Sequence, residues 1–215
     1  RETWAPRFSY TGFRYIQVEY QPALPGGSLP ILHELVGEVV GLNIDQAGMF
    51  NCSCDNIRSI YRLVFNAMVS NLQSVATDCP HREKLGWLEQ LYLMGPSLLY
   101  QFDLRNFLRK ALVDMRDAQQ EQGLVPDIAP EYVIFEDGFR DSPEWGSAVI
   151  QSAWQYYQHY PNLALLRKHY RAMRRYLDYL TSKSKDGIIS HGLGDWYDFG
   201  PGAFGSSQLT SSGIT

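Results

Sequence analysis

The spacing of apolar residues changes near residue 50, and this change limits the fold more than any other feature of the sequence. From there on, apolar residues recur at intervals of three and four, first at Ile57, Ile60, Val64, Met68 and Leu72. These intervals place them on one face of a helix. The same spacing predicts further helices at 83–94, 103–122, 143–160 and 162–183. Residues 49–215 are therefore expected to be mainly α-helical.

The residues before this change are typical of β-strands. "GFRYIQVEY" (12–20) and "ELVGEVVGLNI" (34–44) are rich in β-branched and aromatic residues, and a Pro- and Gly-rich loop separates them. Two or three strands do not form a stable sheet alone. We therefore expect residues 1–48 to be the C-terminal strands of a β-sandwich domain, with the rest of that domain in a longer polypeptide.

Composition argues against several classes of partner. The 215-residue chain has a net charge of −4, whereas nucleic-acid binding needs a clustered basic surface. No apolar run approaches the ~20 residues that span a bilayer, so no membrane partner is predicted. The first residues also lack the apolar region of a secretory signal. Three cysteines without a C-x-x-C pair do not predict a structural zinc site.

A long loop separates two groups of predicted helices. Residues 124–143 are rich in acidic and aromatic side chains, and loops of this length inside compact domains are usually functional. A second such loop follows the last predicted helix. Helices that alternate with loops of this kind favour a toroid of paired helices, with its site at one end, over a plain bundle.

The stretch "TDCPHREKLGW" (77–87) concentrates reactive side chains at a helix end. His81 and Glu83 lack the second histidine of an H-E-x-x-H metal motif, and His81 is too close in sequence to Cys79 to activate it as a nucleophile. An acid–base role for Glu83, with Asp78 nearby, fits better. The alternative is structural, in which Asp78 caps the next helix and Arg82 pairs with Glu83 on the surface.

Two later segments combine aromatic rings with acidic side chains. Carbohydrate sites use this combination, because flat rings pack on the apolar faces of sugars while polar groups bind the hydroxyls. "PEWGSAV" contains Trp145, which is either a core residue or a ligand platform. "GDWYDFG" contains Asp195 and Trp196 among glycines, where a ring is poorly buried. Trp196 is therefore the better candidate for a ligand wall.

The segment "DCPHREKLGW" (78–87) resembles the signature of bacterial family 78 glycoside hydrolases, the inverting α-L-rhamnosidases. "GLVPDIAPEY", "EWGSAV" and "GDWYDFGPG" follow in the order of that family. "GFRYIQVE" resembles the last strands of its β-sandwich. The resemblance implies a mainly α fold: residues 49–215 would be the N-terminal half of an (α/α)₆ toroid, a six-hairpin catalytic barrel, preceded by strands of the sandwich.

The resemblance also implies roles for individual residues. Glu83 takes the place of the general acid, and the expected substrate-binding residues are Asp78, Arg82, Trp87, Gln90, Trp145, Asp195 and Trp196. Gln90 is a departure, because many members have an aspartate there. The family's general base is a glutamate beyond residue 215, so this chain is expected to contain only the acid's half of the site and to be inactive alone.

The implied function is removal of terminal α-L-rhamnose from a rhamnose-containing glycoside or polysaccharide by inversion, without a metal or organic cofactor. The remainder of the same polypeptide would complete the barrel. Three alternatives stay open at this point: a sugar-binding homologue that is catalytically incomplete, a hydrolase for another sugar, and a structural domain whose aromatic residues form the core.

Overall fold

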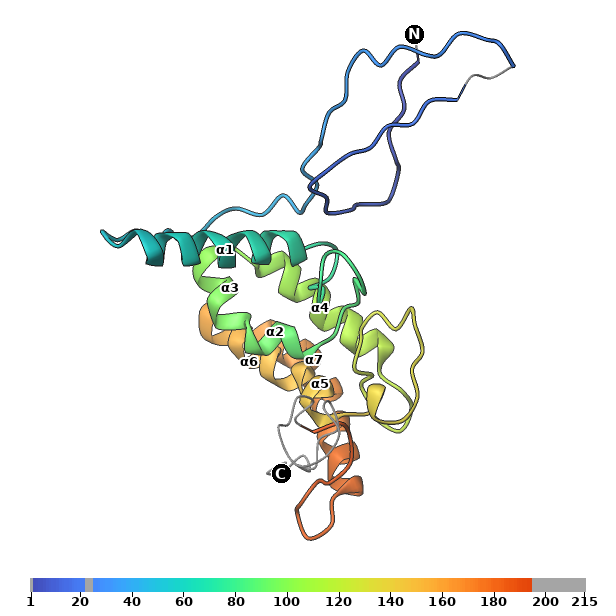
Figure 1. Cartoon of the computed structure of the whole chain (residues 1–215). Helices are drawn as coiled ribbons and strands as arrows, with labels where there is room; N and C mark the ends of the chain where they lie inside the picture. The colour runs from blue at the N-terminus through green and yellow to red at the C-terminus, as the bar shows by residue number, and fades with distance from the viewer. Residues whose placement is uncertain (1, 22–24, 195–215) are drawn as a thin grey trace, which may run out of the picture.

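The computed structural model describes residues 2–21 and 25–194 and is mainly helical, as the sequence predicts. The elements are α1 (Asp55–Asn71), α2 (Glu89–Leu93), α3 (Gly95–Gln101), α4 (Arg105–Ala118), the 3₁₀ turn η1 (Asp137–Phe139), α5 (Pro143–Gly146), α6 (Ala148–His159) and α7 (Leu163–Lys183). Figure 1 shows these helices gathered in one body, with the residues before α1 leaving it as an extended segment.

Short polar contacts set the ends of the longer helices. Asp55 is the first residue of α1 and pairs with Arg58 one turn later, where a carboxylate also interacts favourably with the helix dipole. The Asn162 side chain accepts a hydrogen bond from the Leu165 backbone N–H, at 3.1 Å, and so caps α7.

The second helix begins later than the sequence predicts. It was expected from residue 83, but α2 starts at Glu89. Residues 78–85 instead close into a turn, because the Leu85 backbone N–H donates to Asp78 Oδ1 at 2.9 Å. Pro96 lies in the first turn of α3, where its missing N–H breaks no helical hydrogen bond.

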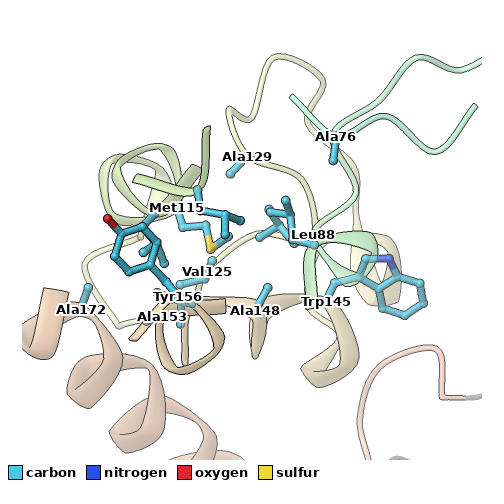
Figure 2. Close-up of a cluster of buried hydrophobic side chains, with 14 of the residues drawn as sticks. Ala76, Leu88, Met115, Val125, Ala129, Trp145, Ala148, Ala153, Tyr156 and Ala172 are labelled. Atoms are coloured by element: carbon cyan, nitrogen blue, oxygen red, sulfur yellow. The ribbon is translucent and has the colours of Figure 1, made fainter. Parts of the chain in front are cut away.

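The core forms around α6, which packs against α2, α4 and α7. Its Ala148, Ala153 and Tyr156 lie among Met115 of α4 and other buried apolar side chains, as Figure 2 shows. Leu112, on the same face of α4, is completely buried. Truncating such a leucine to alanine typically costs about 2–5 kcal/mol, so the α4–α6 contact is a main source of stability.

The expected strands are extended but unpaired. Among the described residues before α1, the single backbone bridge to another segment joins Gln46 to Phe102. Aromatic and apolar side chains of the expected strands are exposed, for example Tyr15 at 91%. A strand needs neighbours to satisfy its backbone and cover its apolar face. The assignment of residues 1–48 to a β-sandwich therefore stays a prediction.

None of the helices within the described residues is long and apolar enough to cross a membrane.

Candidate active site

The turn formed by residues 78–85 lies between α1 and α2 and contains Glu83. Asp78 closes the turn through two hydrogen bonds with Leu85: its backbone N–H donates to the Leu85 carbonyl at 3.1 Å, and its Oδ1 accepts from the Leu85 N–H at 2.9 Å. The Glu83 backbone N–H donates to Cys79 Sγ at 3.2 Å. These contacts hold the peptide on both sides of Glu83, in a segment that has no helix to order it.

The Glu83 carboxyl lies beside an indole and a guanidinium. The Trp87 Nε1–H donates to its Oε2 at 3.1 Å, and Arg82 approaches its Oε1 at 3.4 Å. The Glu83 side chain is 40% exposed. Among the described residues, apolar groups therefore do not bury this side chain. Its carboxyl has a fixed orientation and open access from solvent.

The structural alternative predicted that Arg82 pairs with Glu83 and that Asp78 caps the next helix. The structure shows the ion pair but not the helix cap. Arg82 and Glu83 do form a surface pair, an interaction that contributes at most about 1 kcal/mol. Asp78, in contrast, binds Leu85 and caps no helix. Asp78 thus stabilises the turn of residues 78–85 and not the start of α2.

Trp87 connects the turn to the long loop of residues 124–143. Its backbone forms an antiparallel bridge with Ile128, and its ring stacks on Phe135 with centroids 5.2 Å apart and planes inclined by 26°. Sequence reasoning identified the loop but not Phe135 itself; its aromatic content was the available signal. The two rings form an aromatic wall next to Glu83.

Trp145 supports this wall from behind. It is 8% exposed, belongs to the core cluster and meets Trp87 edge-on, with centroids 6.3 Å apart. In Figure 2 its ring lies at the edge of the cluster and is directed away from Met115 and Tyr156. The structure therefore places Trp145 in the packed layer under Trp87, as the core interpretation expected.

Gln90 lies in the first turn of α2, three residues after Trp87. Its Oε1 is buried and has no hydrogen-bond partner among the described residues. Asp195 and Trp196 lie outside the described residues. The chain leading to them is held at the start of α5, where Ser142 Oγ accepts from the Leu193 N–H at 2.8 Å and His191 Nε2 lies 3.2 Å from Asp141 Oδ1.

Asp127 is a buried acid that sequence reasoning missed. Its carbonyl accepts from the Leu88 N–H at 2.9 Å, and its Oδ1 accepts from the Ser142 N–H at 2.9 Å. Burial, together with the nearby charges of Asp141 and Glu144, raises its pKa to about 8, against the opposing effect of the Ser142 hydrogen bond. Asp127 thus joins the chain around Trp87 to the start of α5.

Within the described part of the chain, no group of three His, Cys, Asp or Glu side chains is arranged to hold a metal ion. A basic pocket does exist between α4 and α7, lined by Arg109, Lys110 and Lys168. It belongs to these two helices and not to the loops that bear Glu83 and Trp87.

Helices joined by long loops, with a carboxyl beside an aromatic wall on those loops, define a helical glycosidase domain. The chain belongs to the family described as the bacterial alpha-L-rhamnosidase 6 hairpin glycosidase domain, which matches residues 45–213.

Relatives and solved structures agree with this family. An alpha-L-rhamnosidase of Formosa agariphila is 29% identical over 204 residues, covering 91% of this chain and 21% of that protein. One of Streptomyces avermitilis is 31% identical over 198 residues, covering 91% and 18%. The chain therefore spans about a fifth of the length of these curated relatives.

Among solved structures, the alpha-L-rhamnosidase from Dictyoglumus thermophilum superposes with a TM-score of 0.71 at 35% identity, covering 78% of this chain and 19% of that one. The Streptomyces avermitilis enzyme complexed with L-rhamnose gives 0.70 at 29% identity, covering 75% and 16%. These likenesses confirm the expected fold class: the helical body is that of a rhamnosidase six-hairpin domain.

Proposed function

We propose that the complete polypeptide containing this chain is an inverting glycoside hydrolase that removes terminal α-L-rhamnose. The observation that carries the proposal is the Glu83 carboxyl held by the Trp87 indole, whose ring stacks on Phe135. A carboxyl beside a flat aromatic surface suits a sugar ring that packs on the aromatic face while the acid reaches its glycosidic oxygen.

In this mechanism Glu83 protonates the leaving-group oxygen. Inversion requires a second carboxylate, roughly 6.5–9.5 Å from the acid, that activates a water molecule on the opposite face of the sugar. We assign that base to a part of the polypeptide outside these 215 residues, which also completes the barrel. The mechanism needs no metal or organic cofactor.

The remaining candidates would bind the sugar. Asp78 has one oxygen engaged with Leu85, and we assign its other oxygen, with Arg82, to sugar hydroxyls. Trp87 forms the wall on this side, with Trp145 beneath it. Asp195 and Trp196 would approach from the loop after α7. The substrate would be a rhamnose-containing glycoside or polysaccharide.

The proposal is tested by hydrolysis of methyl α-L-rhamnoside, whose leaving group needs a proton, by the complete polypeptide. Glu83→Gln should lower kcat by about 10²-fold or more, because the amide cannot donate the proton. Glu121→Gln, at an exposed glutamate after α4, is the matched control and should leave turnover unchanged. Near-normal turnover by Glu83→Gln would remove Glu83 from this role.

Gln90 supports a second candidate, a hydrolase for another sugar. Its buried Oε1 lacks a partner in the described part of the chain, and an amide offers a donor as well as an acceptor, which a carboxylate does not. Comparing aryl α-L-rhamnoside, α-L-mannoside and α-L-lyxoside as substrates separates the two candidates. Sugar binding in calorimetry without release of product would instead support a catalytically incomplete homologue.

A further inference from the structure

Lys84, directly after Glu83, has a left-handed backbone conformation, with φ of 56°. Residues with a Cβ rarely adopt it because it costs free energy, and glycine is the usual choice. Such a conformation persists when the surrounding structure holds it, and it is concentrated at functional sites. A lysine at this position suggests that its side chain has a role which offsets the backbone strain.

Contacts on both sides hold the backbone of Lys84. Its carbonyl accepts a hydrogen bond from the Tyr132 hydroxyl at 2.8 Å. A tyrosine hydroxyl is protonated at neutral pH and can therefore donate this hydrogen bond. The following N–H, of Leu85, donates to Asp78 Oδ1. The peptide after Lys84 is therefore fixed through both its oxygen and its nitrogen.

The Lys84 side chain is held by a distant part of the sequence. Its Nζ donates to the backbone carbonyl of Tyr10 at 2.7 Å and lies 4.4 Å from the centroid of the Tyr10 ring. A cation over an aromatic face is attracted by the ring's quadrupole. Tyr10 precedes Lys84 by 74 residues, so this contact ties the extended N-terminal segment to the turn.

We propose that Lys84 is a positioning residue for Glu83. Its left-handed backbone directs the chain so that the Glu83 carboxyl meets the Trp87 indole, and Tyr10 and Tyr132 hold it in that conformation. Glycine would adopt the same φ without strain but would lose the Tyr10 contact. The inference rests on the proposed function, in which Glu83 is the general acid, and it makes the N-terminal segment part of the acid's support.

The experiment compares two rhamnosides that differ only in the leaving group, using the complete polypeptide. Methanol leaves poorly and needs the proton from Glu83, whereas p-nitrophenolate leaves with little help. Loss of correctly folded protein lowers both rates equally, so their ratio reports on the acid alone. The variants are Lys84→Met and Tyr132→Phe, each of which removes a polar contact and keeps most of the side chain.

In both variants we expect the kcat ratio of methyl to p-nitrophenyl α-L-rhamnoside to fall by about tenfold, since misplacing a reacting group by about 1 Å can cost 10²-fold. KM should change by less than about twofold. The controls Lys168→Met and Tyr170→Phe, at exposed positions of α7, should keep the ratio of the unmodified protein.

Equal losses on the two substrates, or an unchanged ratio, would overturn the role of Lys84 and leave the proposed function standing. Cleavage of neither substrate by the unmodified protein would overturn the proposed function and this inference with it.

Discussion

Replacing Asp127 with asparagine should change how stability depends on pH. The Asp127 side chain is 0% exposed, and its Oδ2 has no hydrogen-bond partner among the described residues. Burial, the largest cause, raises its pKa to about 8. The folded state therefore keeps a proton that the unfolded chain loses at about pH 4. The contribution of the Asp127 carboxyl to the free energy of unfolding is therefore fully present below about pH 4 and is lost as the pH rises through about 8.

The size of the effect follows from this pH window. Between pH 5 and pH 8 the unfolded aspartate is ionised and the folded one largely is not, so unfolding releases nearly one proton. At about 1.4 kcal/mol per pH unit, three units amount to about 4 kcal/mol. The side-chain amide of the Asp127→Asn variant would still accept from the Ser142 N–H and cannot ionise. Any cost of burying this amide is the same at every pH, so the slope is the quantity to measure.

The assay is urea unfolding of the complete polypeptide between pH 5 and pH 8, followed by tryptophan fluorescence. The free energy of unfolding of Asp127→Asn, minus that of the unmodified protein, should rise by about 4 kcal/mol across this range. Asp186→Asn, at an exposed aspartate after α7, is the matched control and should give a flat difference. A flat difference for Asp127→Asn would mean that its carboxyl is already ionised in the folded protein and would refute the reasoning.

Three further changes have expected outcomes. Gln90→Asp should lower KM for an aryl rhamnoside by about tenfold, because a hydrogen bond to a charged group is stronger than one to an amide. Trp87→Leu removes both the Phe135 stack and the donor to Glu83, so kcat should fall by about 10²-fold. Residues 1–215 expressed alone should self-associate in size-exclusion chromatography, because α1 exposes apolar side chains, including Ile60 and Leu63.

The two substitutions have control variants at exposed positions of the same domain, and each of the three predictions has an outcome that would contradict it. Gln151→Asp and Trp154→Leu, both on the exposed side of α6, should leave KM and kcat unchanged. If Gln90→Asp leaves KM unchanged, Gln90 does not contact the sugar. A Trp87→Leu variant with normal kcat would remove the aromatic wall from the mechanism. A sharp monomer peak that melts cooperatively would contradict the expected self-association.

Helices were predictable wherever their own sequence carries the information. The apolar spacing in α1, α4 and α7 identifies a helix without reference to any partner, and these helices lie close to the predicted ranges. The predicted apolar face is buried on α4 and α7, whereas on α1 Met68 is buried and Ile60 is exposed. The helix expected from residue 83 was placed wrongly, because its start depends on the bond between Asp78 and Leu85. The strand-like segments did not pair, because a strand is completed by neighbours and not by its own sequence.

The candidate site was likewise predictable from the sequence only in part. The sequence pointed to Glu83, to Asp78 and to a loop rich in aromatic residues, because residue types and short spacings record the chemistry of a motif. It contained no direct sign that Phe135 would stack on Trp87 or that Asp127 would be buried. Both depend on how a loop folds back over the helices, which is decided by close packing and by the need to satisfy buried polar groups.

The sequence by itself thus determined a helical domain of the rhamnosidase type and the segment that carries the candidate acid. Only the tertiary structure showed that Lys84, next to Glu83, has a left-handed backbone and contacts Tyr10, 74 residues earlier. The physical reason is how far apart in the sequence the interacting residues lie. Periodicity and motifs reflect forces between residues a few positions apart, whereas a strained backbone is held only by contacts that the complete fold brings together.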